Sequence, residues 1–343
     1  MKKILVTGGA GYIGSHTVVE LQNEGYEVHI IDNLSNSQPE VLEGIRKITG
    51  VLPQFKKFDL TDAEAVFNFF RQNEIDAVIH FAAYKAVGES VREPAKYYRN
   101  NLVSLLNLLE AMEQHSCSCM VFSSSCTVYG QPDSLPVTEQ SPVKEALSPY
   151  GNTKQISEEI IRDVINSKQK MKAISLRYFN PIGAHESAII GELPTGVPDN
   201  LVPFITQTAI GIREQLSVFG NDYDTPDGSC IRDYIHVVDL SKAHVSAVKR
   251  LFNQNNKHNF EIFNLGTGQG TSVFEIIDTF EKVTGVKLNY KKAERRPGDV
   301  ACIYADASLA NRELGWKAEK SMEETLLSAW NWEKQLRNRT KQP

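Results

Sequence analysis

The stretch KILVTGGAGYIG, residues 3–14, decides the fold class of this chain. Its first five residues are an apolar run typical of a buried parallel strand, and helical character follows from Gly14. Between the two lies the spacing Gly-x-Gly-x-x-Gly. Gly9 and Gly11 would allow a tight turn and a close approach of backbone to a pyrophosphate, and Gly14 would let the helix pack closely on the strand. The stretch therefore predicts a turn that binds a dinucleotide.

An acidic residue, Asp32, directly follows the second predicted strand at residues 27–31. At this place a carboxylate accepts hydrogen bonds from the ribose hydroxyls of adenosine. Because its charge would repel a 2′-phosphate, we expect NAD rather than NADP as the cofactor. The alternative is that Asp32 only caps a turn at the end of its strand.

Strands and helices alternate along the first half of the chain. We expect strands at residues 3–7, 27–31, 54–58, 77–81, 120–123 and 172–178, and helices at 14–23, 39–48, 63–71, 94–114 and 148–166. This alternation predicts an α/β fold, a Rossmann-type doubly wound parallel sheet.

The alternation breaks after Asn180. Residues 181–201 are rich in glycine and proline and should be irregular. We expect helices at 202–212, 233–249, 273–283 and 321–337, with strands at 217–219 and 260–265. The chain is therefore divided into an NAD-binding Rossmann domain, residues 1–179, and a smaller C-terminal α/β substrate lobe, residues 180–343, some segments of which return to the first domain.

The composition excludes several classes of protein. The chain has 343 residues, 41% of them hydrophobic, which is ample for a buried core. Its net charge of −5 argues against a nucleic-acid partner, since a duplex binder needs a basic face. No apolar run approaches the roughly 20 residues of a membrane helix, so we expect no membrane partner. The five cysteines are scattered without zinc-ligand spacing, which predicts a reduced, cytoplasmic protein with no metal site.

Three side chains form a candidate catalytic set. Ser125 follows the fifth predicted strand, and Tyr150 and Lys154, four residues apart, share one face of the next helix. A free tyrosine, with a pKa of about 10, is a poor base, but a lysine ammonium and a cationic nicotinamide would favour its phenolate. Tyr150 could then take a proton from a substrate hydroxyl while a hydride leaves the same carbon. Lys154 would also hold the nicotinamide ribose, and Ser125 would bind the reacting hydroxyl.

Two predicted helices carry wide apolar arcs. The helix at 94–114 includes Leu105, Leu106 and Leu109, and the helix after Tyr150 includes Ile160 and Ile161. Such an arc is wider than a helix on one sheet face needs. It indicates either ordinary core packing or the shared face of a homodimer.

These motifs resemble those of the extended short-chain dehydrogenase/reductase family and, within it, the UDP-glucose 4-epimerases. The resemblance spans nearly the whole chain. It is carried by the stretches TGGAGYIGS (7–15), KAVGES (85–90), SSSCTVYG (123–130), SPYGNTK (148–154), RYFNPIGA (177–184) and RDYIHV (232–237). It implies an isomerase with tightly held, recycled NAD, a UDP-sugar substrate, and Tyr150, Lys154 and Ser125 as the catalytic residues.

The resemblance also implies ligand contacts at matching positions. Cofactor contacts fall on Gly8, Gly11, Tyr12, Ile13, Gly14, Asp32, Asn33, Asn36, Ser37, Asp59, Leu60, Phe81, Ala82, Lys85, Asn100, Ser123, Tyr150, Lys154 and Tyr178. UDP-sugar contacts fall on Ser125, Tyr150, Phe179, Asn180, Asn200, Leu201, Leu216, Phe219, Arg232, Tyr234, Arg296, Asp299 and Ile303. The chemistry agrees, because two arginines suit a diphosphate and a phenylalanine can pack on uracil. The alternatives are that Asp59 caps the next helix and that each arginine, Arg232 and Arg296, forms only a surface ion pair, for Arg232 beside Asp233.

The reaction implied is oxidation at carbon 4, rotation of a 4-keto sugar, and return of the hydride to its other face. A sugar-nucleotide dehydratase typically has aspartate and glutamate directly after the serine or threonine of the fifth strand. This chain has Cys126 and Thr127 there, which disfavours dehydration. A UDP-uronic acid 4-epimerase keeps the same catalytic set and stays open. A non-enzymatic NAD-binding regulator commonly lacks the tyrosine-lysine pair. This chain has the pair together with the serine, which disfavours that class of protein.

Substrate range is expected to depend on Ile303. In the resembled family this position lines the pocket beside the sugar's 2-substituent, where a tyrosine excludes an N-acetyl group. Isoleucine leaves room, so we expect activity on UDP-galactose and UDP-glucose and also on UDP-GalNAc and UDP-GlcNAc. The alternative is that Ile303 merely packs in the second lobe.

Overall fold

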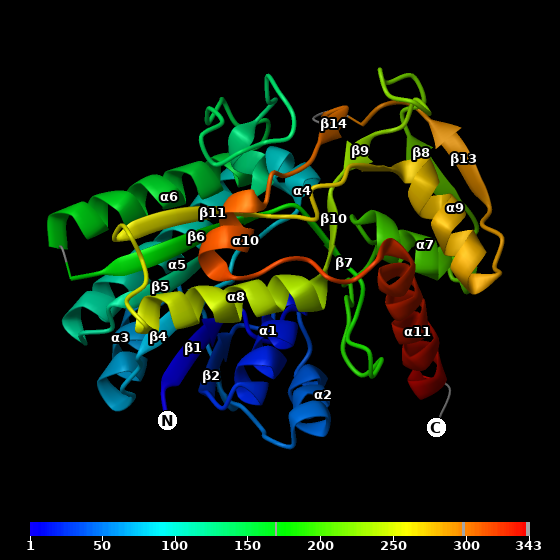
Figure 1. Cartoon of the computed structure of the whole chain (residues 1–343). Helices are drawn as coiled ribbons and strands as arrows, with labels where there is room; N and C mark the ends of the chain where they lie inside the picture. Colours follow the sequence, from blue (N-terminus) through cyan, green and yellow to red (C-terminus); the bar gives the residue numbers. More distant parts are fainter. Residues whose placement is uncertain (169, 297–298, 341–343) are drawn as a thin grey trace.

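A parallel sheet of seven strands forms the centre of the computed structural model (Figure 1). The structure describes residues 1–168, 170–296 and 299–340. The strand order is β11-β6-β5-β4-β1-β2-β3. The strands are β1 (Lys3–Thr7), β2 (Glu27–Asp32), β3 (Gln54–Lys57), β4 (Ala77–His80), β5 (Cys119–Ser125), β6 (Lys172–Tyr178) and β11 (Phe260–Leu265). This confirms the predicted doubly wound sheet, whose order reverses beside β1 and opens a ligand crevice at the carboxyl ends of the strands.

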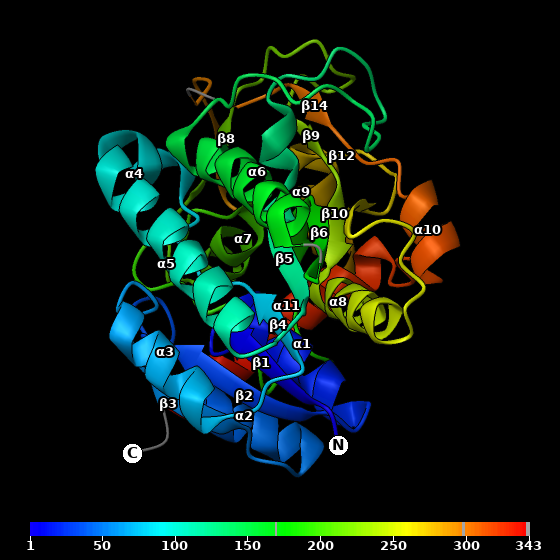
Figure 2. The ribbon, with the colours of Figure 1, turned by 90° about the vertical axis from the view of Figure 1, so that its left-hand side faces the viewer.

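Helices cover both faces of the sheet (Figures 1 and 2). One face carries α1 (Tyr12–Asn23), α2 (Glu40–Thr49) and α8 (Val237–Phe252), and the other carries α3 (Ala63–Gln72), α5 (Pro94–Gln114) and α6 (Pro149–Lys168). Each face buries its own apolar cluster. In β1, Ile4 and Val6 pack into one cluster and Leu5 into the other. A strand buried on both faces needs such a continuous apolar run, which explains the opening residues of the chain.

Short elements and three helices form a smaller assembly beyond the sheet's carboxyl edge. Its sheets pair β10 with β7, β12 and β14 with β9, and β13 with β8. The strands and helices of this assembly are β7 (Asn180–Ile182), α7 (Leu201–Ala209), β8 (Leu216–Phe219), β9 (Ile231–Arg232), β10 (Tyr234–His236), β12 (Thr271–Ser272), α9 (Val273–Thr284), β13 (Tyr290–Ala293), β14 (Cys302–Ile303) and α11 (Met322–Thr340). Three further elements of the chain are α4 (Val87–Arg92), η1 (Cys126–Tyr129) and α10 (Ser308–Leu314). The helices α7, α9 and α11 bury Ile205, Phe280 and Trp330 between them.

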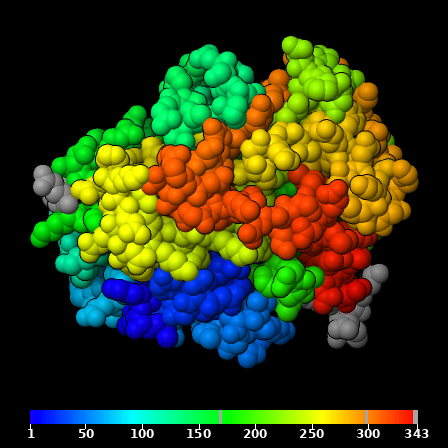
Figure 3. Space-filling model, viewed as in Figure 1, coloured from blue at the N-terminus to red at the C-terminus, as the bar shows by residue number. Residues whose placement is uncertain are grey.

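Later segments of the chain lie against the central sheet. The strand β11 pairs with β6, with Phe260 opposite Ala173, and α8 packs on α1. The segment from α10 to α11 crosses the face formed by α8 (Figure 3). Residues 341–343, which the sequence assigns to the second lobe, lie outside the described residues.

One predicted helix begins later than expected. Residues 233–249 were assigned to a helix, but residues 234–236 form β10 and α8 begins at Val237. The Asp233 carboxylate is buried and accepts hydrogen bonds from Thr267 and Ala305, which holds this segment extended beside β7. His236 then caps the helix by accepting from the Val238 amide. A run of only four residues does not distinguish a strand from a helix, so the prediction was wrong here.

The described helices include none that combines the length and the apolar character needed to cross a membrane.

Candidate active site

The turn after β1 leaves a helix N-terminus without a side-chain cap. Gly8 has φ +70° and its amide donates to the Ile31 carbonyl at 2.8 Å. A Cβ on Gly14 would lie 2.3 Å from the Gly8 oxygen, so only glycine fits there. The N-cap of α1, Gly11, provides no side-chain hydrogen bond, and no acidic residue occupies the first turn. Free amides and the helix dipole at this place suit an anion such as a pyrophosphate.

The Asp32 carboxylate joins the glycine turn to the loop after β2. Asp32 is buried, and it accepts from the amides of Ala10 at 3.1 Å and Leu34 at 2.8 Å and from the Ser37 hydroxyl at 3.1 Å. Asp32 therefore caps the turn at the end of β2, as the alternative from the sequence predicted. An ionised carboxylate has about four lone-pair sites, so it still has room for a ribose hydroxyl.

The loop after β3 brings a second carboxylate to the same edge. Asp59 accepts from the Asn33 amide at 2.8 Å and from the Thr61 hydroxyl at 2.7 Å. Burial raises the pKa of Asp59, but these hydrogen bonds outweigh it and leave the pKa below its ordinary value. The helix α3 is capped by Asp62, whose carboxylate accepts from the Ala65 amide. The alternative that Asp59 caps this helix was therefore wrong.

Three predicted cofactor residues already have partners in the protein. The Tyr12 hydroxyl donates to the Gly183 carbonyl at 2.6 Å, so the phenol points away from the glycine turn. The Leu60 carbonyl accepts from Asn107 at 2.8 Å, and the Asn36 amide oxygen accepts from Thr195 at 2.8 Å. Tyr12 and its neighbour Ile13 can meet a cofactor through their backbone amides.

The candidate catalytic lysine lies inside the protein. Lys154 is buried, its Nζ donates to the Ser123 carbonyl at 2.7 Å, and it lies 5.9 Å from the ring centroid of Tyr150. Burial lowers the pKa of Lys154 to about 8, while the charge of Glu158 raises it. An ammonium has three donors, so two remain for a ligand such as a ribose.

The candidate catalytic tyrosine stays protonated in the chain alone. Burial raises the pKa of Tyr150, and Tyr178 adds to the shift, whereas the Ser125 hydroxyl opposes it. We expected Lys154 and a cationic nicotinamide to favour the phenolate together. The lysine by itself does not bring the pKa of Tyr150 below its ordinary value. A further positive charge in the site would lower the pKa of Tyr150.

Side chains from β5, β6 and the loop after β4 line the same edge. Ser123 and Tyr178 share a hydrogen bond between their hydroxyls. A Cβ on Gly8 would lie 2.8 Å from the Ala82 amide, so the loops after β1 and β4 touch, and Phe81 packs on His244 beside them. Asn100 donates to its neighbour Asn101. Of these predicted cofactor residues, Ser123, Tyr178, Phe81 and Ala82 thus lie along the carboxyl edge of the sheet, at the ends of β5 and β6 and directly after β4.

Glu192 links the two halves of the site and was missed from the sequence. Its carboxylate lies 3.5 Å from Lys85 Nζ and accepts from Asn200 Nδ2 at 2.5 Å. Lys85 was predicted to contact the cofactor and Asn200 the UDP-sugar. Glu192 stands in an irregular segment, where no periodic pattern signals which side chain points inward.

Two arginines converge on one carboxylate in the predicted substrate half. Arg232 Nη2 lies 3.8 Å from Asp299 Oδ1, and Arg296 donates to the two Asp299 oxygens at 3.1 and 3.2 Å. Both arginines therefore form an ion pair, as the alternative expected, but the partner of Arg232 is Asp299 and not Asp233, which accepts from backbone amides. Two cations held by a single carboxylate retain net positive charge for a diphosphate.

The adjacent side chains of Arg295 and Arg296 point in different directions. The Phe219 side chain is 44% exposed, and the Arg296 guanidinium lies 5.8 Å from its ring centroid. Arg295 instead donates to Asp222 at 2.7 Å and lies over Tyr223. Arg296 therefore faces the predicted uracil position and Arg295 does not.

Several predicted substrate residues are core residues. Leu216 and Tyr234 are buried in the cluster of α7, α9 and α11, and Leu201 packs against that cluster. Asn180 lies opposite Tyr234 in the pairing of β7 with β10. Such residues can reach a ligand mainly through backbone atoms or ring edges.

Ile303 lies between the two halves. It is 4% exposed and belongs to one apolar cluster with Phe179, against which Cys126 packs. Its neighbours Cys302 and Tyr304 are less buried, as the expected alternation requires. Cys126 directly follows Ser125, so this cluster adjoins the candidate catalytic set.

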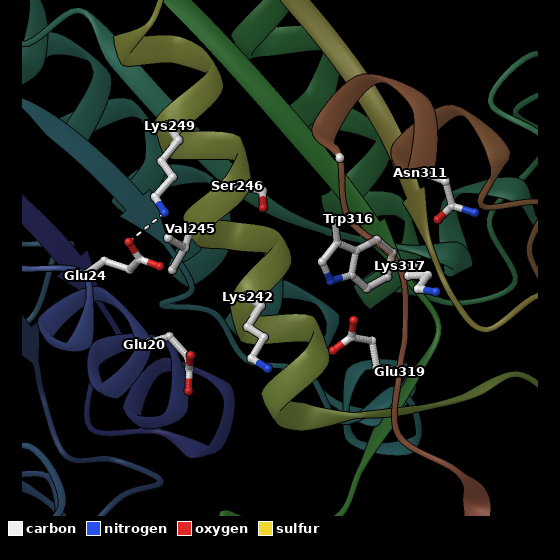
Figure 4. A pocket seen from close by; sticks show the side chains of 11 residues that line it. Glu20, Glu24, Lys242, Val245, Ser246, Lys249, Asn311, Trp316, Lys317 and Glu319 are labelled. Carbon is white, nitrogen blue, oxygen red and sulfur yellow. Dashed lines mark hydrogen bonds and ion pairs between the residues drawn. The ribbon is translucent and has the colours of Figure 1, made fainter.

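A separate cavity of about 490 Å³ lies between α1, α8 and the segment joining α10 to α11 (Figure 4). Its charged lining carries both signs, namely Glu20, Glu24, Lys242, Lys249, Lys317 and Glu319. None of the predicted site residues is among those that line it. The cavity is therefore distinct from the candidate active site.

Comparisons with known proteins show extensive similarity. A family profile described as GDP-mannose 4,6 dehydratase matches residues 5–328. A UDP-glucose 4-epimerase from Bacillus subtilis is 53% identical over 330 residues, 96% of each chain. A crystal structure of the Bifidobacterium longum UDP-glucose 4-epimerase with NAD+ and UDP is 47% identical, with a TM-score of 0.95 over 98% of this chain and 99% of that one. The UDP-Glc/GlcNAc 4-epimerase from Campylobacter jejuni is 38% identical, with a TM-score of 0.83 over 98% of this chain and 100% of that one.

Proposed function

The chain belongs to the UDP-glucose 4-epimerases of the extended short-chain dehydrogenase/reductase family, and from this premise we propose how its residues act. It is an isomerase that catalyses the NAD-dependent 4-epimerisation of UDP-hexoses. The observation that carries the residue assignment is the placement of Lys154 and Tyr150 beside the end of β5, next to an uncapped glycine turn. The assignment of individual residues is our own proposal.

The cofactor half would hold NAD through the glycine turn and the strand ends. The α1 amides would bind the pyrophosphate, Asp32 the adenosine ribose, and Lys154 the nicotinamide ribose. When bound, oxidised NAD supplies a hydride acceptor and a positive charge. The carboxylate of Asp32 disfavours a 2′-phosphate in the same place.

Tyr150 is the acid/base residue of this proposal. It removes the proton from the hydroxyl at carbon 4 of the sugar and later gives it back. Its raised pKa means that the free chain does not hold a phenolate, which ties activation to the occupied site. Ser125, at the end of β5, donates to or accepts from the reacting oxygen.

The substrate half would bind the nucleotide and leave the sugar able to rotate. Arg232 and Arg296 neutralise the diphosphate, and Phe219 packs on uracil. Binding the constant UDP part, rather than the sugar hydroxyls, suits a reaction in which either face of carbon 4 must meet the same cofactor.

Dehydration is disfavoured although the matching family profile carries a dehydratase description. Water loss across carbons 5 and 6 needs an acid/base pair beside the catalytic serine. Here Cys126 and Thr127 follow Ser125, and burial raises the pKa of Cys126 to about 12. A neutral thiol at physiological pH is a poor substitute for a carboxylate.

We propose that the enzyme also accepts UDP-GalNAc and UDP-GlcNAc. Ile303 packs with Phe179 next to the catalytic segment, and it lacks the ring and hydroxyl of a tyrosine. The similar Campylobacter jejuni protein is named for both sugar types.

Three further assignments remain proposals. We propose a homodimer through α5 and α6, which pack side by side, with Leu106 of α5 40% exposed. A monomeric mass by light scattering would contradict it. We also propose that the chain is divided into an NAD-binding domain, residues 1–179, and a substrate lobe, residues 180–343. We further propose a cytoplasmic location, which is supported by the five cysteines, none of which forms a disulfide bond in the described part of the chain.

The function is tested by incubating purified protein with a panel of UDP-sugars without added NAD and separating the products. We expect interconversion of the galactose and glucose forms. Loss of water would indicate a dehydratase, and turnover confined to UDP-uronic acids would favour the alternative epimerase.

A further inference from the structure

A buried carboxylate with four hydrogen bonds lies beneath the candidate catalytic set. Glu158 on α6 is 3% exposed. It accepts from the hydroxyls of Ser124 at 2.6 Å and Ser175 at 2.7 Å, and from Arg177 Nε at 3.0 Å and Nη2 at 2.5 Å. Arg177 is also buried and lies over the Tyr129 ring at 4.8 Å. Every oxygen of the carboxylate is thus engaged.

These partners lie on the elements that present the catalytic residues. Ser124 stands between Ser123 and Ser125 on β5, and Arg177 directly precedes Tyr178 on β6. Glu158 itself follows Tyr150 and Lys154 on α6. One side chain therefore ties together the three elements whose relative placement defines the site.

Lys154 does not form a hydrogen bond with the Glu158 carboxylate. Lysine and glutamate four residues apart on a helix lie close enough to form an ion pair. Here the Glu158 carboxylate accepts from Ser124, Ser175 and Arg177, and Lys154 donates to the Ser123 carbonyl instead. The lysine is thus near a negative charge without being bonded to it, which leaves two of its protons for a ligand.

We propose that Glu158 is a positioning residue for the epimerase reaction, holding β5, β6 and α6 in register so that Lys154 stays at the end of β5 and free to bind a ligand. The proposal rests on the proposed function for the role of Lys154. It concerns a residue that touches neither substrate nor cofactor.

The titratable groups around Lys154 determine in which direction its pKa should move when Glu158 is replaced. They are Tyr150 and Glu158 of α6 and His80 of β4, and Tyr178 of β6 bonds to the hydroxyl of Ser123, whose carbonyl accepts from Lys154. Burial lowers the pKa of His80 to about 3 and raises that of Tyr178 to about 12, so both are neutral at pH 7. The Glu158 charge raises the pKa of Lys154 against burial. Without it, Lys154 would lose its proton at a lower pH.

A second buried pair provides a matched control. Glu261 on β11 accepts from Arg250 of α8 at 2.7 and 2.9 Å, and this pair is nearly as buried as the Glu158 pair. Glu158→Gln leaves Arg177 facing a neutral amide, whereas in Glu261→Gln the Glu313 carboxylate still lies 3.3 Å from Arg250 Nη2. Both variants should lose thermal stability, and the loss should be larger for Glu158→Gln. Only Glu158 is bonded to the end of β5.

The experiment compares the two variants with wild type as purified holoenzymes, between about pH 6 and pH 10, a range that spans the Lys154 pKa. For Glu158→Gln we expect kcat on UDP-galactose to fall roughly 10- to 100-fold with a nearly unchanged KM, because small misplacements are costly. The alkaline loss of rate should move to lower pH. Glu261→Gln should keep the wild-type profile, and Glu158→Asp should restore the alkaline limb.

Release of bound NAD gives a readout that does not need turnover. Below about pH 8, where Lys154 keeps its proton in wild type but loses it earlier in the variant, Glu158→Gln should release NAD faster than wild type, and Glu261→Gln should not. An inactive wild type would contradict the proposed function, while the release profiles would still test the role of Glu158. Equal profiles for the two variants, or a Glu158→Gln profile like that of wild type, would overturn the proposal.

Discussion

The proposed cofactor half and the proposed substrate half of the site differ in how their side chains are held. In the cofactor half, Asp32 and Lys154 are buried and bonded largely to backbone atoms of neighbouring strands and turns. In the substrate half, Phe219 is exposed, and Arg232 and Arg296 are held by a single carboxylate. The first half is thus organised by the fold itself, whereas the second has charges that a ligand can complete. Substitutions in the cofactor half should affect NAD retention and kcat. Substitutions in the substrate half should affect KM.

The largest effect should come from Tyr150→Phe. The ring and its packing remain and only the proton acceptor is lost, so turnover should fall by about 10²- to 10⁴-fold. UDP-galactose binding, measured by calorimetry, should stay near wild type because the arginines are untouched. A variant within a few-fold of wild-type kcat would remove Tyr150 from the mechanism.

Ile303→Tyr tests the boundary between the halves. The larger side chain should reject the N-acetyl group by steric exclusion, lowering turnover of UDP-GalNAc roughly 10- to 200-fold, while UDP-galactose turnover is spared. Steady-state rates on both substrates check this. Retention of both activities by the variant, or wild type without any N-acetylhexosamine turnover, would show that substrate range is not set at this residue.

Arg232→Ala tests the substrate half alone. Loss of a charge-assisted contact to the diphosphate is worth about 1.5–3 kcal/mol, so KM should rise roughly 10- to 100-fold with NAD retained. Arg295→Ala is the matched control, because Arg295 is engaged by Asp222 and Tyr223. Equal KM values for the two variants would contradict the placement of the diphosphate.

Asp32→Ala should have a smaller effect, confined to the cofactor half. Loss of the ribose contact should weaken NAD retention by about tenfold, while the fold persists because the change is at a strand end. Nucleotide released on denaturation checks this, and in wild type it should be NAD rather than NADP. A wild type that carries mainly the phosphorylated nucleotide would contradict the role of Asp32.

The difference between the two halves of the site also explains which of its residues and contacts could be predicted from the sequence. The glycine turn and Asp32 lie close together in the chain, so local spacing was enough to place them. The partner of Arg232 could not be predicted, because Asp299 lies in a distant segment and the adjacent Asp233 was the nearer candidate. Glu158 and Glu192 were missed because no periodic pattern signals a carboxylate that points inward from a helix or a loop. The start of α8 was misplaced because a short apolar strand resembles the first turn of a helix.

The central claim is that one site removes and returns the same hydride at carbon 4. The most direct measurement uses UDP-galactose with deuterium at carbon 4, wild-type protein and no added NAD. We predict that the UDP-glucose formed retains the deuterium at carbon 4, because the hydride never leaves the site. Product that has lost the label, or conversion that requires added NAD at each turnover, would contradict the account.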